Sequence, residues 1–169
     1  MKNTTHRIVI SSMFAALACV ATMVIKIPSP LEGYINLGDC MVLLSAWILS
    51  PGYAFLAAGL GSGLADLFSG YVLYAPATFV IKGLMTLAAI GVFRLLSKKL
   101  RDLPSRIISG IAAEIIMILG YFLFEGFLYG FEPSLVNIPA NAAQGAMGVL
   151  IGVILIKIFE KQHLTNLFK

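Results

Sequence analysis

The chain of 169 residues carries 59% apolar and 12% charged side chains, whereas a soluble domain averages about half apolar and about a quarter charged residues. This composition excludes a soluble globular protein and predicts an integral membrane protein with a single domain over residues 1–169. The net charge of +4 does not indicate nucleic-acid binding, because the basic residues gather at the ends of apolar segments rather than along one face.

The first two apolar segments differ in length. The first predicts a membrane-crossing helix over residues 8–25, and a stripe of small side chains along it would allow close contact with another helix. This stripe consists of Ser11, Ala15, Ala18, Cys19 and Thr22. A proline-containing loop at 27–36 shows no regular pattern and is expected to form a lid. The second helix, over 37–49, is short for a full crossing and carries Asp39 in its first turn.

Four further apolar segments complete six predicted membrane crossings. They cover residues 53–68, 77–96, 105–129 and 134–160. We expect the last of them to bend at Pro139. Gly59 and Gly63, one helical turn apart, predict close packing of the third helix against a neighbour. Asp66 and Lys82 lie at similar depths on the two sides of the turn between the third and fourth helices, so we predict an ion pair between them.

The basic residues set the expected orientation in the membrane. Six crossings place both termini and the loop 94–106 on one side, and they place the turn that holds Tyr71 and Tyr74, expected as interfacial aromatics, on the other. Ten of the twelve lysines and arginines fall on the first side: Lys2, Arg7, Arg94, Lys98, Lys99, Arg101, Arg106, Lys157, Lys161 and Lys169. Because basic loops stay in the cytoplasm, the sequence predicts an all-α bundle of six transmembrane helices with both termini cytoplasmic.

Three amides share one face of the last predicted helix. Asn137, Asn141 and Gln144 are spaced by four and three residues. Such groups are costly in hydrocarbon unless a polar partner meets them. Amides both donate and accept hydrogen bonds, which suits a neutral or zwitterionic small molecule with hydroxyls and ring nitrogens. The alternative is hydrogen bonding between membrane helices; we favour a ligand site because three amides lie in register.

Four charged side chains and one tyrosine complete the candidate site. Glu114 and Glu125 are eleven residues apart, so they share a helix face with Tyr121. Glu114 falls in the middle of the bundle, an expensive place for an acid, which indicates a ligand or network role. Asp39 and Lys82 are further candidates, with a helix-start carboxylate and a structural ion pair as the alternatives. The inner half shows no intramembrane polar group, which favours a cavity open to the outside over a proton wire or a channel.

Four short motifs carry a resemblance to a known family. They are GYINLGD at 33–39, GLADL at 63–67, GY at 70–71 and APATFVIKG at 75–83. With its small size and six predicted helices, the whole chain resembles the substrate-binding S components of energy-coupling-factor (ECF) vitamin transporters. The motifs are similar to those of the riboflavin-type branch, which also includes subunits for hydroxymethylpyrimidine and pyridoxine-like compounds.

The resemblance implies partners and a location. Such a protein would bind a vitamin at the outer face under its first loop, in a bacterial plasma membrane. It would join a transmembrane coupling (T) subunit and two cytoplasmic ATPases, and it would tip over in the membrane to release its ligand inside. Family members carry an Ala-xxx-Ala pattern on the first helix for the coupling subunit. The nearest match here is Ser11-xxx-Ala15-xxx-Cys19, so the small-residue stripe is the expected contact face.

The expected ligand is a pyridoxine- or hydroxymethylpyrimidine-like ring, with riboflavin as the alternative, because amides and acids outnumber stacking platforms. Its expected contacts are Asn137, Asn141, Gln144, Glu114, Tyr121, Glu125, Lys82 and Asp39. A stand-alone secondary transporter and a lipid-modifying enzyme are the rival classes. We expect no enzyme, because the sequence lacks clustered acids or histidines at the cytoplasmic interface. We also expect no cofactor and no metal, because Cys19 and Cys40 lack metal-ligand spacing.

Overall fold

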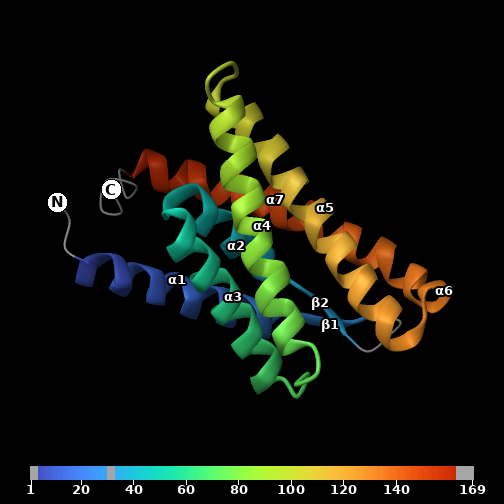
Figure 1. Cartoon of the computed structure of the whole chain (residues 1–169). Coiled ribbons are helices and arrows are strands. Elements are labelled where there is room, and N and C mark those ends of the chain that lie inside the picture. Colours follow the sequence, from blue (N-terminus) through green and yellow to red (C-terminus); the bar gives the residue numbers. More distant parts are fainter. Residues whose placement is uncertain (1–3, 30–32, 163–169) are drawn as a thin grey trace.

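The computed structural model describes residues 4–29 and 33–162 as a helical bundle with one two-stranded hairpin (Figure 1). Its elements are α1 (Thr4–Val24), β1 (Lys26–Pro28), β2 (Tyr34–Asn36), α2 (Gly38–Ile48), α3 (Pro51–Phe68), α4 (Ala75–Leu96), α5 (Asp102–Tyr129), α6 (Phe131–Ser134), the 3-10 helix η1 (Leu135–Asn137) and α7 (Ile138–Lys161). Within the described residues, α1, α4, α5 and the run Phe131–Lys161 are long and apolar enough to cross a membrane. Lys2 and Lys169, which contribute to the predicted orientation, lie outside the described residues.

The bundle confirms the predicted all-α membrane fold, and each predicted helix begins and ends within about one turn of an observed one. The second helix is short, as expected, with 11 residues. The last predicted helix, over 134–160, is instead divided into α6, η1 and α7. Pro139 lies in the first turn of α7, directly after the 3-10 turn, where its missing N–H costs no hydrogen bond, and the bend expected there remains a prediction.

The helix ends separate into two groups (Figure 1). The start of α1, the end of α7 and the α4–α5 turn lie toward the upper left of the figure, and we name this group the inner end. The hairpin, the α3–α4 turn and α6 lie toward the lower right and form the outer end. This separation matches the expected connectivity, while the assignment of the inner end to the cytoplasm remains a prediction from the basic residues.

The segment 27–36, expected as an irregular loop, contains a short antiparallel hairpin. Strands β1 and β2 pair with Ile27 opposite Ile35. Two strands of three residues each are too short to give a clear alternating pattern, which explains why the sequence did not reveal them. β2 lies against α7, where the backbone N–H of Asn36 donates to Gln144 Oε1 at 2.8 Å. The hairpin is thereby fastened to the helix that carries the three amides.

Glycines in α3 allow close contact with two neighbouring helices. Gly59 and Gly63 face α4, and a Cβ added at Gly59 would lie 2.7 Å from the Phe79 carbonyl oxygen. The predicted close packing at this glycine pair is therefore confirmed. Gly61 faces α1, and a Cβ there would lie 2.9 Å from the Cβ of Ala18. Contact between α1 and α3 thus depends on small side chains from both helices.

The small-residue stripe of α1 lies largely inside the bundle. Its buried members are Ser11, Ala18 and Thr22, and its half-buried members are Ala15 and Cys19. A side chain buried against α2 and α3 cannot contact another subunit in this conformation. Most of the expected contact face is therefore used for packing within the bundle. The neighbouring small residues Ser12 and Ala16 are exposed.

Candidate ligand-binding site

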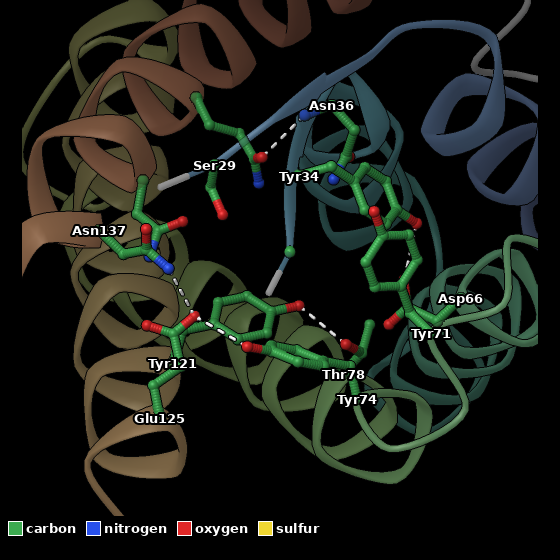
Figure 2. A pocket seen from close by; sticks show the side chains of 13 residues that line it. Ser29, Tyr34, Asn36, Asp66, Tyr71, Tyr74, Thr78, Tyr121, Glu125 and Asn137 are labelled. Carbon is green, nitrogen blue, oxygen red and sulfur yellow. Dashed lines mark hydrogen bonds between the residues drawn. The ribbon is translucent and has the colours of Figure 1, made fainter. Parts of the chain in front are cut away.

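A cavity lies beside β2 at the outer end of the bundle (Figure 2). It is lined by Ser29, Gly33, Tyr34, Asn36, Asp66, Tyr71, Tyr74, Thr78, Tyr121, Glu125, Asn137, Asn141 and Gln144. The volume of the cavity is about 30 Å³, whereas pockets that hold small molecules measure roughly 300–1,000 Å³. The cavity is therefore contracted, and a ring-sized ligand can enter only if the hairpin or the lining side chains move.

The three amides predicted from the sequence all line this cavity. Asn137 Nδ2 donates to Glu125 Oε1 at 2.9 Å. Gln144 accepts from a backbone N–H of β2 at 2.8 Å and donates to Asp39 Oδ2 at 2.6 Å. Asn141 is half-buried. Two of the amides thus form hydrogen bonds between separate elements, as expected from the alternative of hydrogen bonding between helices. All three line one cavity.

A buried ion pair lies behind the cavity wall. Lys82 Nζ on α4 contacts Asp39 Oδ1 on α2, and both side chains are buried. Lys82 also lies 5.5 Å from the centroid of the Tyr121 ring. The predicted pair of Lys82 with Asp66 is therefore wrong, because α2 brings a nearer carboxylate and Asp66 accepts instead from the Tyr34 hydroxyl at 2.7 Å. Lys82 and Asp39 support the wall through the α7 amide and do not line the cavity.

Glu114 is buried behind the same wall. The residue is 5% exposed, and neither carboxylate oxygen has a hydrogen-bond partner among the described residues. It packs against glycines of α7, since a Cβ at Gly145 would lie 3.0 Å from Glu114 Oε2. Glu114 does not line the cavity in this conformation. Within residues 4–29 and 33–162, no group of three or more His, Cys, Asp or Glu side chains is placed to hold a metal ion.

The sequence interpretation missed a group of tyrosines in the wall. The Tyr34 and Tyr71 rings lie 4.8 Å apart, and the Tyr71 and Tyr74 rings lie 6.4 Å apart at 90°. Burial and the neighbouring Asp66 carboxylate raise the pKa of Tyr34, so its hydroxyl stays protonated and donates to that acid. Tyr71 and Tyr74 closely follow Asp66 in the chain. An acid and two aromatic residues around one turn are the sequence pattern that could have indicated this wall.

Two predicted residues of α5 face the cavity beside these rings (Figure 2). Glu125 is 3% exposed, and its Oε1 accepts from Asn137 and, at 3.5 Å, from the Tyr74 hydroxyl. The other oxygen, Oε2, has no hydrogen-bond partner within the described part of the chain. The hydroxyls of Tyr121 and Thr78 lie 3.0 Å apart. Glu125 therefore retains capacity to accept a further hydrogen bond or to meet a positive charge.

The inner end contains a buried arginine in the first turns of α5, at the end of the basic 94–106 loop, and the expected lack of intramembrane polar groups in the inner half remains a prediction. Arg106 is 8% exposed and lies 5.6 Å from the Trp47 ring centroid and 5.0 Å from that of Phe93. Its guanidinium donates to Glu160 Oε1. The indole N–H of Trp47 donates to Ser109 Oγ at 3.1 Å. These groups contact one another and are not part of the cavity lining.

Comparison with known proteins agrees with this architecture. A model of the family described as ECF-type riboflavin transporter, S component, matches residues 2–161. The chain is 34% identical over 134 residues, covering 79% of this chain and 87% of the relative, to a Pyrococcus woesei protein described as "Uncharacterized protein in gap 3'region". A solved S component of a bacterial ECF transporter matches with a TM-score of 0.76 at 24% identity, over 94% of this chain and 98% of that chain. The chain therefore belongs to the ECF-type riboflavin transporter S component family.

Proposed function

We propose that this S component captures a pyridoxine- or hydroxymethylpyrimidine-like ring at the outer face, for ATP-driven uptake by partner subunits. The observation that carries the proposal is the convergence of Asn137, Asn141, Gln144 and Glu125 on one cavity beside β2. Amide and carboxylate groups can together satisfy the hydroxyls and ring nitrogens of such a ligand. Membership of the family supports the role of a substrate-binding subunit over that of a stand-alone transporter.

Riboflavin is the second candidate, because the description of the matching family names it. The contracted cavity favours the smaller ring. Its wall includes Tyr74 and Glu125, which are buried, and a three-ring flavin requires these side chains to open farther than a single ring does.

The hairpin is the proposed lid over the ligand. Hydrogen bonds to three helices hold β2 to the bundle: the Asn36 N–H donates to Gln144 on α7, the Asn36 side chain accepts from Gly38 on α2, and the Tyr34 hydroxyl donates to Asp66 on α3. Because the acceptors Gln144 and Asp66 line the cavity, a ligand that competes for them also affects the hairpin. Segments of this kind commonly close over bound ligands.

The proposed partners are a T subunit and two cytoplasmic ATPases, in a bacterial plasma membrane with both chain termini in the cytoplasm. The chain sequence has no nucleotide-binding motif, so ATP hydrolysis belongs to the partners. Because Ser11, Ala18 and Thr22 are buried, the contact face on α1 shifts by one residue to Ser12 and Ala16. These two small side chains are exposed and four residues apart, which suits close contact with another membrane helix.

Native mass spectrometry of the purified full chain tests the ligand class. A co-purified molecule with the mass of pyridoxine or hydroxymethylpyrimidine is the expected result, and the mass of riboflavin would select the second candidate. Calorimetry with the identified compound should then show that Asn141→Ala weakens binding by about 1–3 kcal/mol, the cost of leaving a buried polar partner unpaired. Gln162→Ala removes an exposed amide at the inner end and should bind as wild type does. Equal affinities of Asn141→Ala and wild type would contradict the site.

A further inference from the structure

The cavity wall combines aromatic rings with acids. Its rings are Tyr34, Tyr71, Tyr74 and Tyr121, and its acids are Asp66 and Glu125. No lysine, arginine or histidine is among the lining residues in the part of the chain that the structure describes. Aromatic rings carry negative charge on their faces, and carboxylates carry it outright. The wall therefore has the composition of a site for a positive charge.

Two of these rings already contact ammonium groups of the protein itself. Lys26 Nζ lies 5.7 Å from the Tyr34 ring centroid, and Lys82 Nζ lies 5.5 Å from that of Tyr121. Other partners hold both ammonium groups outside the cavity lining, since Lys26 donates to Ser69 Oγ at 2.9 Å and Lys82 forms its ion pair. These two rings thus already contact cations in the protein, although neither lysine lines the cavity.

The two lining acids have uncharged hydrogen-bond partners, and Lys26 and Lys82 attract Asp66 only from outside the cavity lining. Asp66 and Glu125 are 5% and 3% exposed, and neither forms an ion pair within residues 4–29 and 33–162. Their hydrogen-bond donors are uncharged: the Tyr34 hydroxyl for Asp66, and the Asn137 amide and the Tyr74 hydroxyl for Glu125. Glu125 Oε2 has no hydrogen-bond partner among the described residues. A buried acid in a membrane bundle is expensive without an opposite charge, so a charged ligand would complete this site.

We propose that the ligand is a cation, a ring that bears a pyridinium or ammonium group together with a hydroxyl. The positive charge lies against the rings of Tyr71 and Tyr74, within reach of Asp66 and Glu125, and the hydroxyl meets the amides of α7. This inference rests on the proposed function and narrows it. The amides alone indicate a neutral or zwitterionic solute, and the tyrosines and acids add the requirement for positive charge.

Two probes of the same shape test the charge directly. N-Methyl-meta-(hydroxymethyl)pyridinium and meta-methylbenzyl alcohol share their outline and hydroxyl, but only the first is charged. Calorimetry on the full chain in nanodiscs should show that the pyridinium binds about tenfold tighter or more, which is within the range of a desolvated cation–π contact. Equal or tighter binding of the neutral ring would overturn the cation proposal and leave the proposed function standing. Failure of both rings to bind at millimolar concentration would contradict the cation proposal and the proposed function together.

Variants of the wall show whether these residues cause the preference. Glu125→Gln and Tyr71→Leu should each reduce the affinity ratio of the two probes about three- to tenfold, because each removes one attraction for the cation. Glu132→Gln and Tyr53→Leu make the same chemical changes outside the cavity lining and should keep the wild-type ratio. The ratio is informative because misfolding lowers both affinities together. A wild-type ratio in both wall variants would overturn the proposal.

Discussion

The two ends of the bundle bury charge in different ways. At the outer end, Lys82 and Asp39 pair inside the protein, with side chains that are 2% and 0% exposed. At the inner end, Arg106 pairs with Glu160, whose side chain is 40% exposed, and stacks on Trp47. The outer charges depend on each other where water does not reach, whereas the inner pair remains partly solvated. Polar residues of this membrane protein therefore serve two purposes: at the outer end they build a cavity wall, and at the inner end they anchor helix ends near the membrane surface.

The largest effect is expected from breaking the outer pair. Lys82→Met leaves Asp39 buried without its counter-charge and should lower the free energy of unfolding by about 3–5 kcal/mol. Thermal unfolding of the full chain in detergent measures this loss. The double variant Lys82→Met/Asp39→Asn should recover most of it, because residue 39 then no longer carries a buried charge without its counter-charge. A single variant as stable as wild type would show that the pair does not hold the outer end together.

Bound ligand should protect the outer end and leave the inner end unchanged. At about 100 times its dissociation constant, a ligand stabilises the form that binds it by about 2.7 kcal/mol. Protease cleavage that requires the hairpin to open should then slow by about a hundredfold. Limited proteolysis of the hairpin with and without the co-purified vitamin measures this effect, and cleavage at the 97–101 turn is the internal control. Hairpin cleavage at the same rate in both conditions would argue against a lid.

A smaller loss of stability is expected at the inner end. Arg106→Met removes a stacking contact worth about 0.5–2 kcal/mol and a partly solvated ion pair worth about 0–1 kcal/mol, so the expected total is about 0.5–3 kcal/mol. Glu160→Gln removes only the pair and should cost about 0–1 kcal/mol. The same thermal unfolding measurement applies. If Arg106→Met proves as damaging as Lys82→Met, the contrast between the two ends is wrong.

Helix positions could be predicted because they depend on local properties of the chain. Apolar length and turn residues located every α-helix except the short α6 to within about one turn, and helical spacing placed Asn137, Asn141, Gln144, Tyr121 and Glu125 on faces that line the observed cavity. The short motifs were also sufficient for the family. These inferences required no knowledge of how the helices pack.

Partner choice and the tyrosine wall could not be predicted in the same way. Lys82 and Asp66 match in depth, but depth does not give the rotation of a helix, and α2 brings Asp39 nearer to the lysine. Tyr34 lies on a strand, and Tyr71 lies in a turn, where no helical period ties side chains to a common face. Chain packing brings these rings together, so only the structure shows that they share a cavity.

The smallest effect on the chain itself is expected on the exposed face of α1. Ala16 is exposed, so Ala16→Trp should leave unfolding and ligand binding close to wild type while it blocks the approach of a coupling subunit. ATP-driven uptake by vesicles that hold the whole complex should then be lost. Ala15→Trp is the matched comparison one residue away: Ala15 is half-buried and packs against a buried cluster that includes Ala57 of α3, so the larger side chain should cost about 1–3 kcal/mol of stability through overpacking. Full uptake by Ala16→Trp would remove this face from transport, and a stability loss equal to that of Ala15→Trp would place Ala16 inside the fold.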